Sequence, residues 1–206
     1  MHLPWKRKQI YKPDDFWLQK VSYKIENDRV KFFKSLCENK KVIHFGCTDW
    51  PVFNPENNLH IKLNQYAKVL HGFDIDLKGI EILKNYVDQK YYSDFNDLEN
   101  EEYDVCLIPE TIEHVENIAS FLRDVSAKVN AKAYYITGPN CFATAHITRN
   151  IVTKDTFTEI VHPDHNCWFS PFTLKNSINK YSSLEVNQVY LLENETMVCC
   201  EAFKKK

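Results

Sequence analysis

The sequence predicts a doubly wound α/β domain with a mostly parallel sheet and an antiparallel end. Three observations predict this fold class. Continuous apolar runs, typical of parallel strands covered on both faces, alternate with segments of helical spacing. A βαβ unit occupies residues 41–76, and two final strands at 184–191 and 196–203 form a hairpin across a short polar turn. The length of 206 residues suits one domain with a sizeable core.

The βαβ unit has the plan of a nucleotide-binding site. An apolar run at 42–45 leads into a turn at 46–49, a helix-like polar segment follows, and a second apolar run at 69–73 ends on Asp74. A short turn after the first strand lets backbone N–H groups and a helix N-terminus face a ligand. The acid after the second strand can accept two hydrogen bonds from a ribose diol.

The spacing of apolar residues and the positions of capping residues and prolines predict the remaining elements in order. We expect residues 1–38 to form a helical extension that ends in a helix over 28–37. Ser170 as N-cap and Pro171 at the first helical position predict a helix that runs to about residue 181. Residues 138–168 are less regular, and we expect them to form a loop region on the substrate side. Further helices are expected at 76–86 and from 113 or 117 to 129, and further strands at 91–92, 103–108 and 133–137.

Composition restricts the class of protein. Lysine and arginine (26) nearly balance aspartate and glutamate (28), so the surface lacks the basic excess of a nucleic-acid binder. The seven cysteines contain no CxxC pair, which favours reduced thiols in a cytosolic protein over a zinc ribbon or a disulfide framework. No apolar run approaches membrane-spanning length. We therefore expect a soluble, cytoplasmic protein.

Five sequence segments occur in a familiar order. They are His-Phe-Gly-Cys-Thr-Asp at 44–49, Gly-Phe-Asp-Ile-Asp at 72–76, Ser-Asp-Phe at 93–95, Glu-Thr-Ile-Glu-His-Val at 110–115, and His-Pro-Asp-His at 162–165 followed by Trp-Phe-Ser at 168–170. Together they resemble the motifs of class I S-adenosylmethionine-dependent methyltransferases, over most of the chain. The resemblance implies a Rossmann-like fold with a mostly parallel seven-stranded sheet whose last strand is antiparallel. It also implies S-adenosyl-L-methionine as cofactor and S-adenosyl-L-homocysteine as product.

The resemblance implies which residues bind that cofactor. The backbone of Gly46 and Cys47 would pack against its methionine part, Asp74 would take the ribose hydroxyls, and Asp94 the adenine amino group. The full expected set is His44, Gly46, Cys47, Asp74, Ile75, Asp94, Phe95, Pro109 and Glu110. The first motif departs from the family pattern, because His44 replaces an acid, and Thr48 and Trp50 stand at later glycine positions.

Each of these residues also has a simpler role. Gly46 can merely end a strand. Asp74 can cap the next helix, although Asp76 could do so equally well, and Asp94 can be a surface turn acid. His60 either borders the cofactor's carboxylate or lies on the surface of a helix.

The candidate catalytic residues are histidines. We expect the loop at 162–165 to cover the substrate, with His165 or His162 as general base or hydrogen-bond partner. His114 stands four residues after Glu110 and can lie one helical turn away, where it touches the substrate, orients that acid or tethers the helix start. His146 and Arg149 would share the role at the substrate.

The loop at 162–165 also raises the question of a metal. Two imidazoles and a carboxylate occur within four residues there. The proline inside the cluster and the lack of a clear further ligand argue against a dedicated site. We therefore expect no metal.

The histidines expected near the carboxyl edge of the sheet favour O-methylation of a small polar metabolite. The segments at 162–165 and 168–170 resemble a subset of the family that modifies sugars and other small metabolites, which implies a sugar, a glycan intermediate or a nucleotide-linked sugar as first choice. We expect no nucleic acid partner and no membrane span, and a homodimer remains open. One alternative is an N- or C-methyltransferase on another metabolite. Another is a non-catalytic methyltransferase-like domain that has lost cofactor binding, because the first motif lacks the later glycines of the family pattern. A NAD-dependent enzyme is disfavoured because the sequence lacks GxGxxG.

Overall fold

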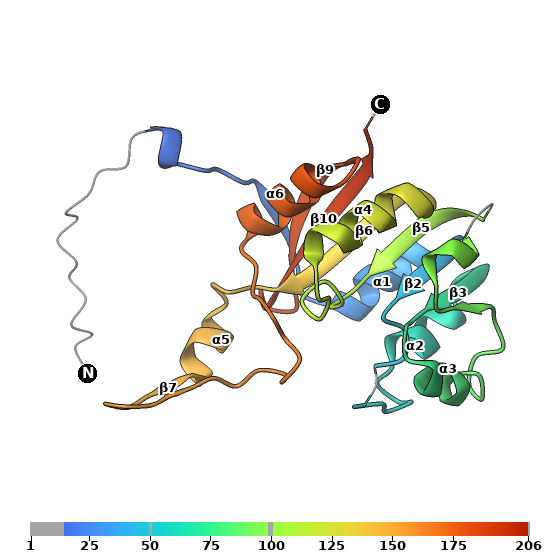
Figure 1. Cartoon of the computed structure of the whole chain (residues 1–206), viewed down its shortest axis with the longest axis horizontal. Coiled ribbons are helices and arrows are strands. Elements are labelled where there is room, and N and C mark those ends of the chain that lie inside the picture. Colours follow the sequence, from blue (N-terminus) through green and yellow to red (C-terminus); the bar gives the residue numbers. More distant parts are fainter. Residues whose placement is uncertain (1–14, 50, 99–100, 206) are drawn as a thin grey trace.

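The computed structural model describes residues 15–49, 51–98 and 101–205 (Figure 1). The strands are β1 (Tyr23–Glu26), β2 (Lys41–Phe45), β3 (Val69–Phe73), β4 (Tyr91–Tyr92), β5 (Glu102–Ile108), β6 (Asn130–Pro139), β7 (Ile151–Val152), β8 (Phe157–Thr158), β9 (Leu184–Leu192) and β10 (Met197–Lys204). The helices are α1 (Arg29–Cys37), α2 (Leu59–Asn64), α3 (Leu77–Leu83), α4 (Ile118–Lys128), α5 (Thr144–Arg149) and α6 (Pro171–Tyr181), with 3₁₀ turns at Asp15–Trp17 and Phe95–Leu98.

The main sheet has eight strands in the order β1-β9-β10-β6-β5-β2-β3-β4. Every neighbouring pair is parallel except those of β10, which runs antiparallel to both β6 and β9. The predicted fold class is therefore confirmed. The order reverses at β2, since the chain continues to β3 and β4 on one side and to β5 and β6 on the other. Open sheets of this kind bind ligands at such a reversal, beyond the carboxyl ends of the strands.

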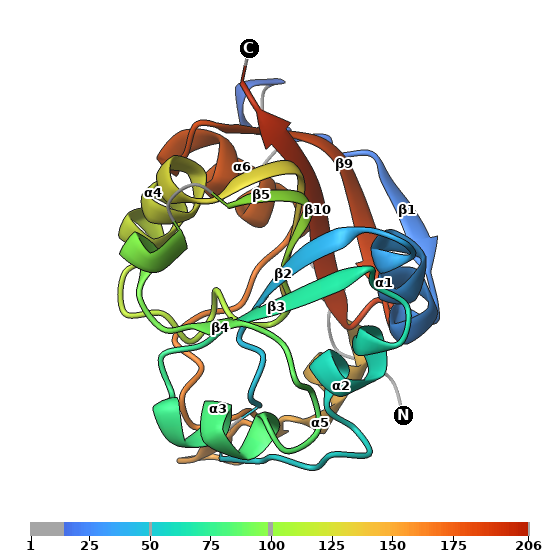
Figure 2. The same cartoon turned by 90° about the vertical axis from the view of Figure 1, so that its right-hand side faces the viewer.

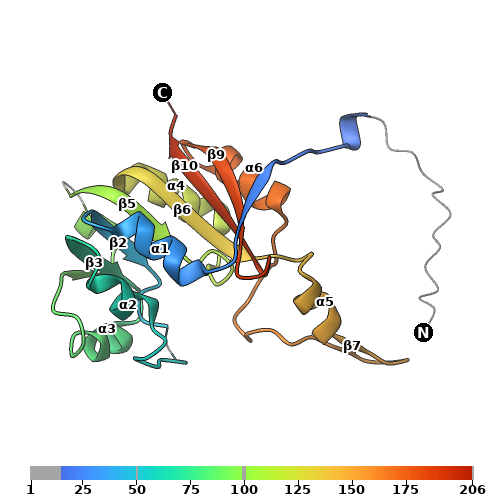
Figure 3. The same cartoon turned by 180° about the vertical axis from the view of Figure 1, so that it is seen from behind.

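Helices cover both faces of the sheet (Figures 2 and 3). On one face, α4 and α6 bury Leu122, Val125, Leu174 and Ile178 in the larger core cluster. On the other face, α1 and α2 bury Phe33, Cys37, Leu59 and Leu63 in a second cluster. The adjacent Cys199 and Cys200 belong to different clusters, because successive residues of a strand point to opposite faces.

Local sequence signals explain where the helices start. Ser170 caps α6 through a capping box with Thr173, and Pro171 occupies the first turn, as predicted. Asp28 caps α1 by accepting a hydrogen bond from Lys31 N. These caps satisfy N–H groups that would otherwise lack partners at the helix starts.

The N-terminal prediction is partly wrong. Within the described part of the expected helical extension, α1 forms as predicted, but residues 23–26 form strand β1, which pairs in parallel with β9. This pairing adds an eighth strand to the seven expected. Residues 1–14 lie outside the described residues. The short strand was missed because its side chains are all exposed and show no alternation of burial.

Residues 138–168 are more regular than expected. They include α5 and the β7–β8 hairpin, which together project from the body of the molecule beyond the end of the sheet (Figure 1). In the described part of the chain, no helix combines the length and the apolarity needed to cross a bilayer.

Candidate functional site

The turn after β2 lies at the reversal of the sheet and requires a glycine at its start. Gly46 has a φ of +67°, and its N–H donates to Phe73 O at 2.9 Å. A Cβ at this position would collide with Thr111 Oγ1. Thr111 follows β5, and its hydroxyl donates to Pro109 O at 3.0 Å. Gly46 is therefore required both by its backbone conformation and by the close approach of the β5 edge.

The carboxylate of Asp74 holds this turn. Its Oδ2 accepts hydrogen bonds from Thr48 N at 3.1 Å and Thr48 Oγ1 at 2.9 Å, and its Oδ1 accepts one from Asp76 N at 3.0 Å. The cap of α3 is Asp76, which accepts from Lys78 N, so Asp74 does not serve as the helix cap. A carboxylate offers about four acceptor positions, so one on Oδ1 stays open to a ligand hydroxyl.

Ile75 presents an apolar surface beside that carboxylate. Its side chain is 83% exposed at the carboxyl edge of the sheet, next to the half-buried Asp74. An exposed isoleucine of this kind can contact the flat face of a bound ring.

His44 and Cys47 lie in the interior. His44 is 2% exposed and its Nδ1 lies 3.1 Å from Nδ1 of the fully buried His60. Burial lowers the pKa of His44 to about 3 and lowers that of His60 well below its usual value. Burial, with the charge of Asp74 second, raises the pKa of the Cys47 thiol. The side chains of His44 and Cys47 therefore pack in the interior next to the turn. His60 is buried as well, and does not lie on the exposed surface of a helix.

Asp94 and Phe95 stand at the start of a 3₁₀ turn after β4. Asp94 is exposed, and its Oδ1 accepts a hydrogen bond from Asn96 N at 2.8 Å. The ring of Phe95 packs on Phe73 and Phe45, with centroids at 4.8 and 5.6 Å. Phe95 therefore packs the 3₁₀ turn against the carboxyl ends of β2 and β3.

Glu110 has a strained backbone at the carboxyl end of β5. Its φ is +43°, which a non-glycine residue rarely adopts. Its N–H donates to Thr137 Oγ1 at 2.9 Å, and its carboxylate pairs with Arg29 of α1 at 2.5 Å. Pro109, the residue before it, is buried. Strain of this kind is typical of functional sites, where the surrounding structure holds it in place.

A pocket of about 160 Å³ opens beside Glu110 on the substrate side. It brings together His146, Arg149, His162 and His165, which were expected at the substrate, and Glu110, which was expected at the cofactor, although they come from three separate segments of the chain. Its lining residues are Glu110, Pro139, His146, Arg149, Ile160, Val161, His162, His165, Trp168, Thr196 and Met197. A second pocket of about 170 Å³ shares His146 and Trp168 with the first.

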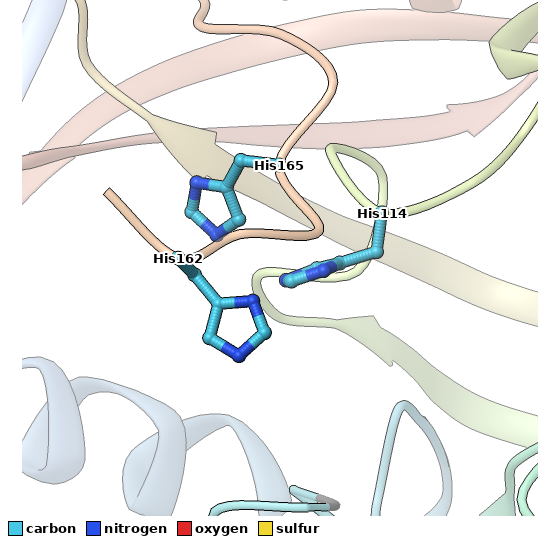
Figure 4. Close-up of side chains that lie close together, drawn as sticks. All are labelled: His114, His162 and His165. Carbon is cyan, nitrogen blue, oxygen red and sulfur yellow. The ribbon is translucent and has the colours of Figure 1, made fainter. Parts of the chain in front are cut away.

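The three candidate catalytic histidines lie together next to this pocket (Figure 4). The ring centroid of His114 lies 4.6 Å from that of His165 and 5.3 Å from that of His162. Burial, then the nearby His114 and His162, lowers the pKa of His165 to about 4, so its ring is neutral at pH 7. Glu113 is fully buried beside them, and burial raises its pKa to about 8.

Sequence reasoning missed several residues of the site. Arg29 and Thr137 hold Glu110 from distant parts of the chain, and nothing in the local sequence indicated those pairings. Thr111 and Glu113 lie inside a motif that was recognised, but their packing against Gly46 and among the histidines was not predicted.

Comparisons with known proteins agree with the fold. The sequence matches no family model, and no curated protein matches it. Among solved structures, the chain is similar to a candidate type 11 methyltransferase of Sulfolobus solfataricus, with 12% identity, a TM-score of 0.59, and coverage of 86% of this chain and 90% of the other.

Two further structures are similar at the same low identity of 12%. The N-methyltransferase NodS of Bradyrhizobium japonicum gives a TM-score of 0.56 and coverage of 86% and 95%. Magnesium protoporphyrin IX methyltransferase of Synechocystis, solved with bound S-adenosylhomocysteine, gives 0.52 and coverage of 85% and 80%. The chain therefore has the Rossmann-like fold of S-adenosylmethionine-dependent methyltransferases. One of these names specifies N-methylation and another specifies magnesium protoporphyrin IX, so the fold alone does not specify an acceptor.

Proposed function

We propose that this protein is an S-adenosylmethionine-dependent methyltransferase acting on a small polar metabolite, with O-methylation of a sugar or glycan intermediate as the first choice. The observation that carries the proposal is the arrangement at the sheet reversal. There Gly46, in a left-handed conformation, opens a turn whose Thr48 donates two hydrogen bonds to the carboxylate of Asp74, at the edge where open α/β sheets bind ligands.

The residues at the donor end fit a nucleoside. Asp74 keeps an acceptor position on Oδ1 for a ribose hydroxyl, and Ile75 offers an exposed apolar surface for the base. The exposed Asp94 carboxylate accepts one backbone hydrogen bond and can also accept from an exocyclic amino group. When bound, S-adenosylmethionine supplies an already activated methyl group, so the protein's main task is to hold the acceptor atom in line.

The residues at the acceptor end fit a polar molecule with hydroxyl groups. The pocket of about 160 Å³ presents imidazoles, a guanidinium and a carboxylate together with Trp168. His114, His162 and His165 are the groups that can hold an acceptor hydroxyl or take up its proton. Arg149 can donate to ring oxygens or to a phosphate of a nucleotide-linked sugar.

A non-catalytic domain is the second candidate, and one observation favours it. Asp74 already makes three hydrogen bonds within the protein, so its hold on a ribose is weaker than that of a free carboxylate. Replacement of the later glycines by Thr48 and Trp50 points the same way. An N- or C-methyltransferase remains the alternative within enzymes.

Calorimetry separates these candidates. Titration of the full chain with S-adenosylmethionine and with S-adenosylhomocysteine should give micromolar binding of both for the proposed enzyme. A folded protein that binds neither is the non-catalytic domain. A screen of sugars and nucleotide sugars with labelled methyl donor then tests the acceptor class, and transfer to amines alone would reject O-methylation.

A further inference from the structure

His114, His162 and His165 converge on one point from two separate loops (Figure 4). His114 follows β5 in a turn closed by its own N–H to Thr111 O, and the other two share a turn before α6 in which His165 N donates to His162 O. One ring nitrogen from each histidine lies within 4.8 Å of the other two. In the sequence, the lack of a clear further ligand near residues 162–165 argued against a metal. In the structure, His114 supplies that further ligand from another loop.

Two carboxylates stand behind this cluster. Glu113 Oε1 lies 4.0 Å from His165 Nε2, and Asp164 Oδ2 lies 4.0 Å from His162 Nδ1. Glu113 is 0% exposed, yet neither of its carboxylate oxygens has a hydrogen-bond partner among the described residues. The buried Nδ1 of His165 is also without a partner among them. Buried polar groups are normally satisfied, so this arrangement points to a ligand that engages them.

We propose that His114, His162 and His165 form a binding site for a divalent first-row transition metal, with zinc as the reference ion. Imidazole nitrogen is a ligand that zinc and its neighbours prefer, whereas magnesium and calcium prefer oxygen. The buried carboxyl group of Glu113 lies 4.0 Å from Nε2 of His165, in the position from which carboxyl groups commonly orient metal-binding histidines.

The geometry needs only a local contraction to bind the ion. Three nitrogens at about 2.1 Å from a tetrahedral metal are about 3.4 Å apart. The present separations of up to 4.8 Å can close by rotation of the side chains, because His162 and His165 lie in an irregular loop and His114 is exposed. No backbone rearrangement of the sheet is required.

The open side of this three-histidine site faces the pocket. His162 and His165 line that pocket together with Glu110. Three protein ligands leave a position for an exogenous ligand, as in catalytic zinc sites. This step rests on the proposed function: an acceptor hydroxyl in the pocket would complete the coordination, and the ion would lower its pKa. In that arrangement the histidines are ligands and none of them serves as general base, because the hydroxyl proton passes to solvent water at the open pocket as the metal-bound oxygen takes the methyl group.

Metal binding is measured on the full chain without any methyl donor. Protein freed of metal by a chelator is titrated with zinc chloride by calorimetry, and cobalt(II) is added in parallel to follow its visible absorption bands. We expect one zinc ion per chain at micromolar affinity or tighter, competition between zinc and cobalt, and no displacement by excess magnesium. The result does not depend on binding of S-adenosylmethionine, so failure of one proposal leaves the other intact.

Variants locate the ion. Glu113→Gln should weaken zinc binding about 10- to 100-fold, and His162→Gln or His114→Gln should weaken it more strongly. His146→Gln is the matched control, since it removes an imidazole of the same pocket that is outside the cluster. Circular dichroism confirms that each variant is folded. Zinc binding by the folded wild type no tighter than by the His114→Gln/His162→Gln double variant would overturn the proposal, as would a preference for magnesium.

Discussion

His44 of β2 and His60 of α2 face each other inside the protein, with 3.1 Å between their Nδ1 atoms. Their rings stack with centroids 5.3 Å apart. One imidazole donates a hydrogen bond and the other accepts it, so the pair joins the first turn of α2 to the sheet directly behind the Gly46 turn. His44, which makes this contact, stands where the resemblance to methyltransferases would place an acid.

The first prediction is that this pair makes stability depend on pH. Burial holds the pKa of His44 at about 3 and that of His60 below its usual value, whereas both titrate near 6.5 when unfolded. Below pH ~6.5 the unfolded chain therefore binds more protons, and the free energy of unfolding falls as the pH drops towards ~3. For His44 alone the loss at pH ~5 is about 2 kcal/mol. Urea denaturation between pH ~7.5 and ~5 measures it. His60→Gln should show a shallower pH dependence, and an unchanged slope would contradict the assignment.

The second prediction concerns Gly46. Gly46→Ala should reduce the free energy of unfolding by about 1–3 kcal/mol, because alanine is strained at a φ of +67° and its Cβ meets Thr111 Oγ1. Thr111→Ala removes the collision and leaves the strain. The double variant should therefore recover part of the loss in a double-mutant cycle. Additive effects would mean that the two residues do not touch.

The third prediction concerns Asp74. Asp74→Ala should weaken binding of S-adenosylhomocysteine by about 1–3 kcal/mol, through loss of the ribose contact and loosening of the turn at Thr48. Asp76→Ala is the control, since it removes the cap of α3 and leaves that turn bonded. Calorimetry compares the two. Equal affinities for Asp74→Ala and wild type would reject the assignment of Asp74 to the ribose.

The fourth prediction concerns backbone strain at Glu110. Glu110→Gly relieves a φ of +43° but also loses the ion pair with Arg29, so its free energy of unfolding should exceed that of Glu110→Gln by about 1 kcal/mol, and its turnover should fall. Glu110→Gln keeps the strained backbone and removes the charge that pairs with Arg29. Thermal unfolding of both variants separates strain from charge. If the melting temperature of Glu110→Gly is lower than that of Glu110→Gln, the positive φ of residue 110 does not destabilise the protein.

The fifth prediction separates chemistry from donor binding. His165→Ala should reduce methyl transfer to the true acceptor and leave the affinity for S-adenosylhomocysteine unchanged, because His165 lines the pocket on the substrate side, and Asp74 is not among the residues that line it. The same pair of measurements applies to His114→Ala. Full turnover by His165→Ala would exclude this histidine from the reaction.

The sequence predicted those parts of the fold that depend on local signals. The N-cap and proline at residues 170–171 predicted the start of α6, and the apolar runs predicted the central strands. Strand β1 was missed, because its exposed side chains carry no pattern and only its partner β9 makes it a strand. Tertiary pairing decided that element, and no local propensity revealed it.

The candidate site divides in the same way. Gly46 and Asp74 were identifiable because a turn and an acid follow two adjacent strands in sequence order. The convergence of His114 with His162 and His165 could not be identified from the sequence, because it depends on how two loops far apart in the chain fold over the same sheet edge. The interior positions of His44 and His60 were also hidden, because a histidine after an apolar run looks the same whether it faces a ligand or another imidazole.

The position of β10 between β6 and β9 has a consequence for how this chain reaches its native state. The hairpin partner β9, and β1 beyond it, connect to the central strands only through β10, the last strand in chain order. Contacts that join the beginning and the end of the sequence must therefore form before the sheet is continuous. Folding of this kind is slow, because distant segments must meet before their contacts compensate the lost chain entropy. During synthesis on the ribosome, β9 and β1 can join the central strands only after β10 has emerged from the exit tunnel. Until then the unpaired edge of β6 can pair with strands of other chains.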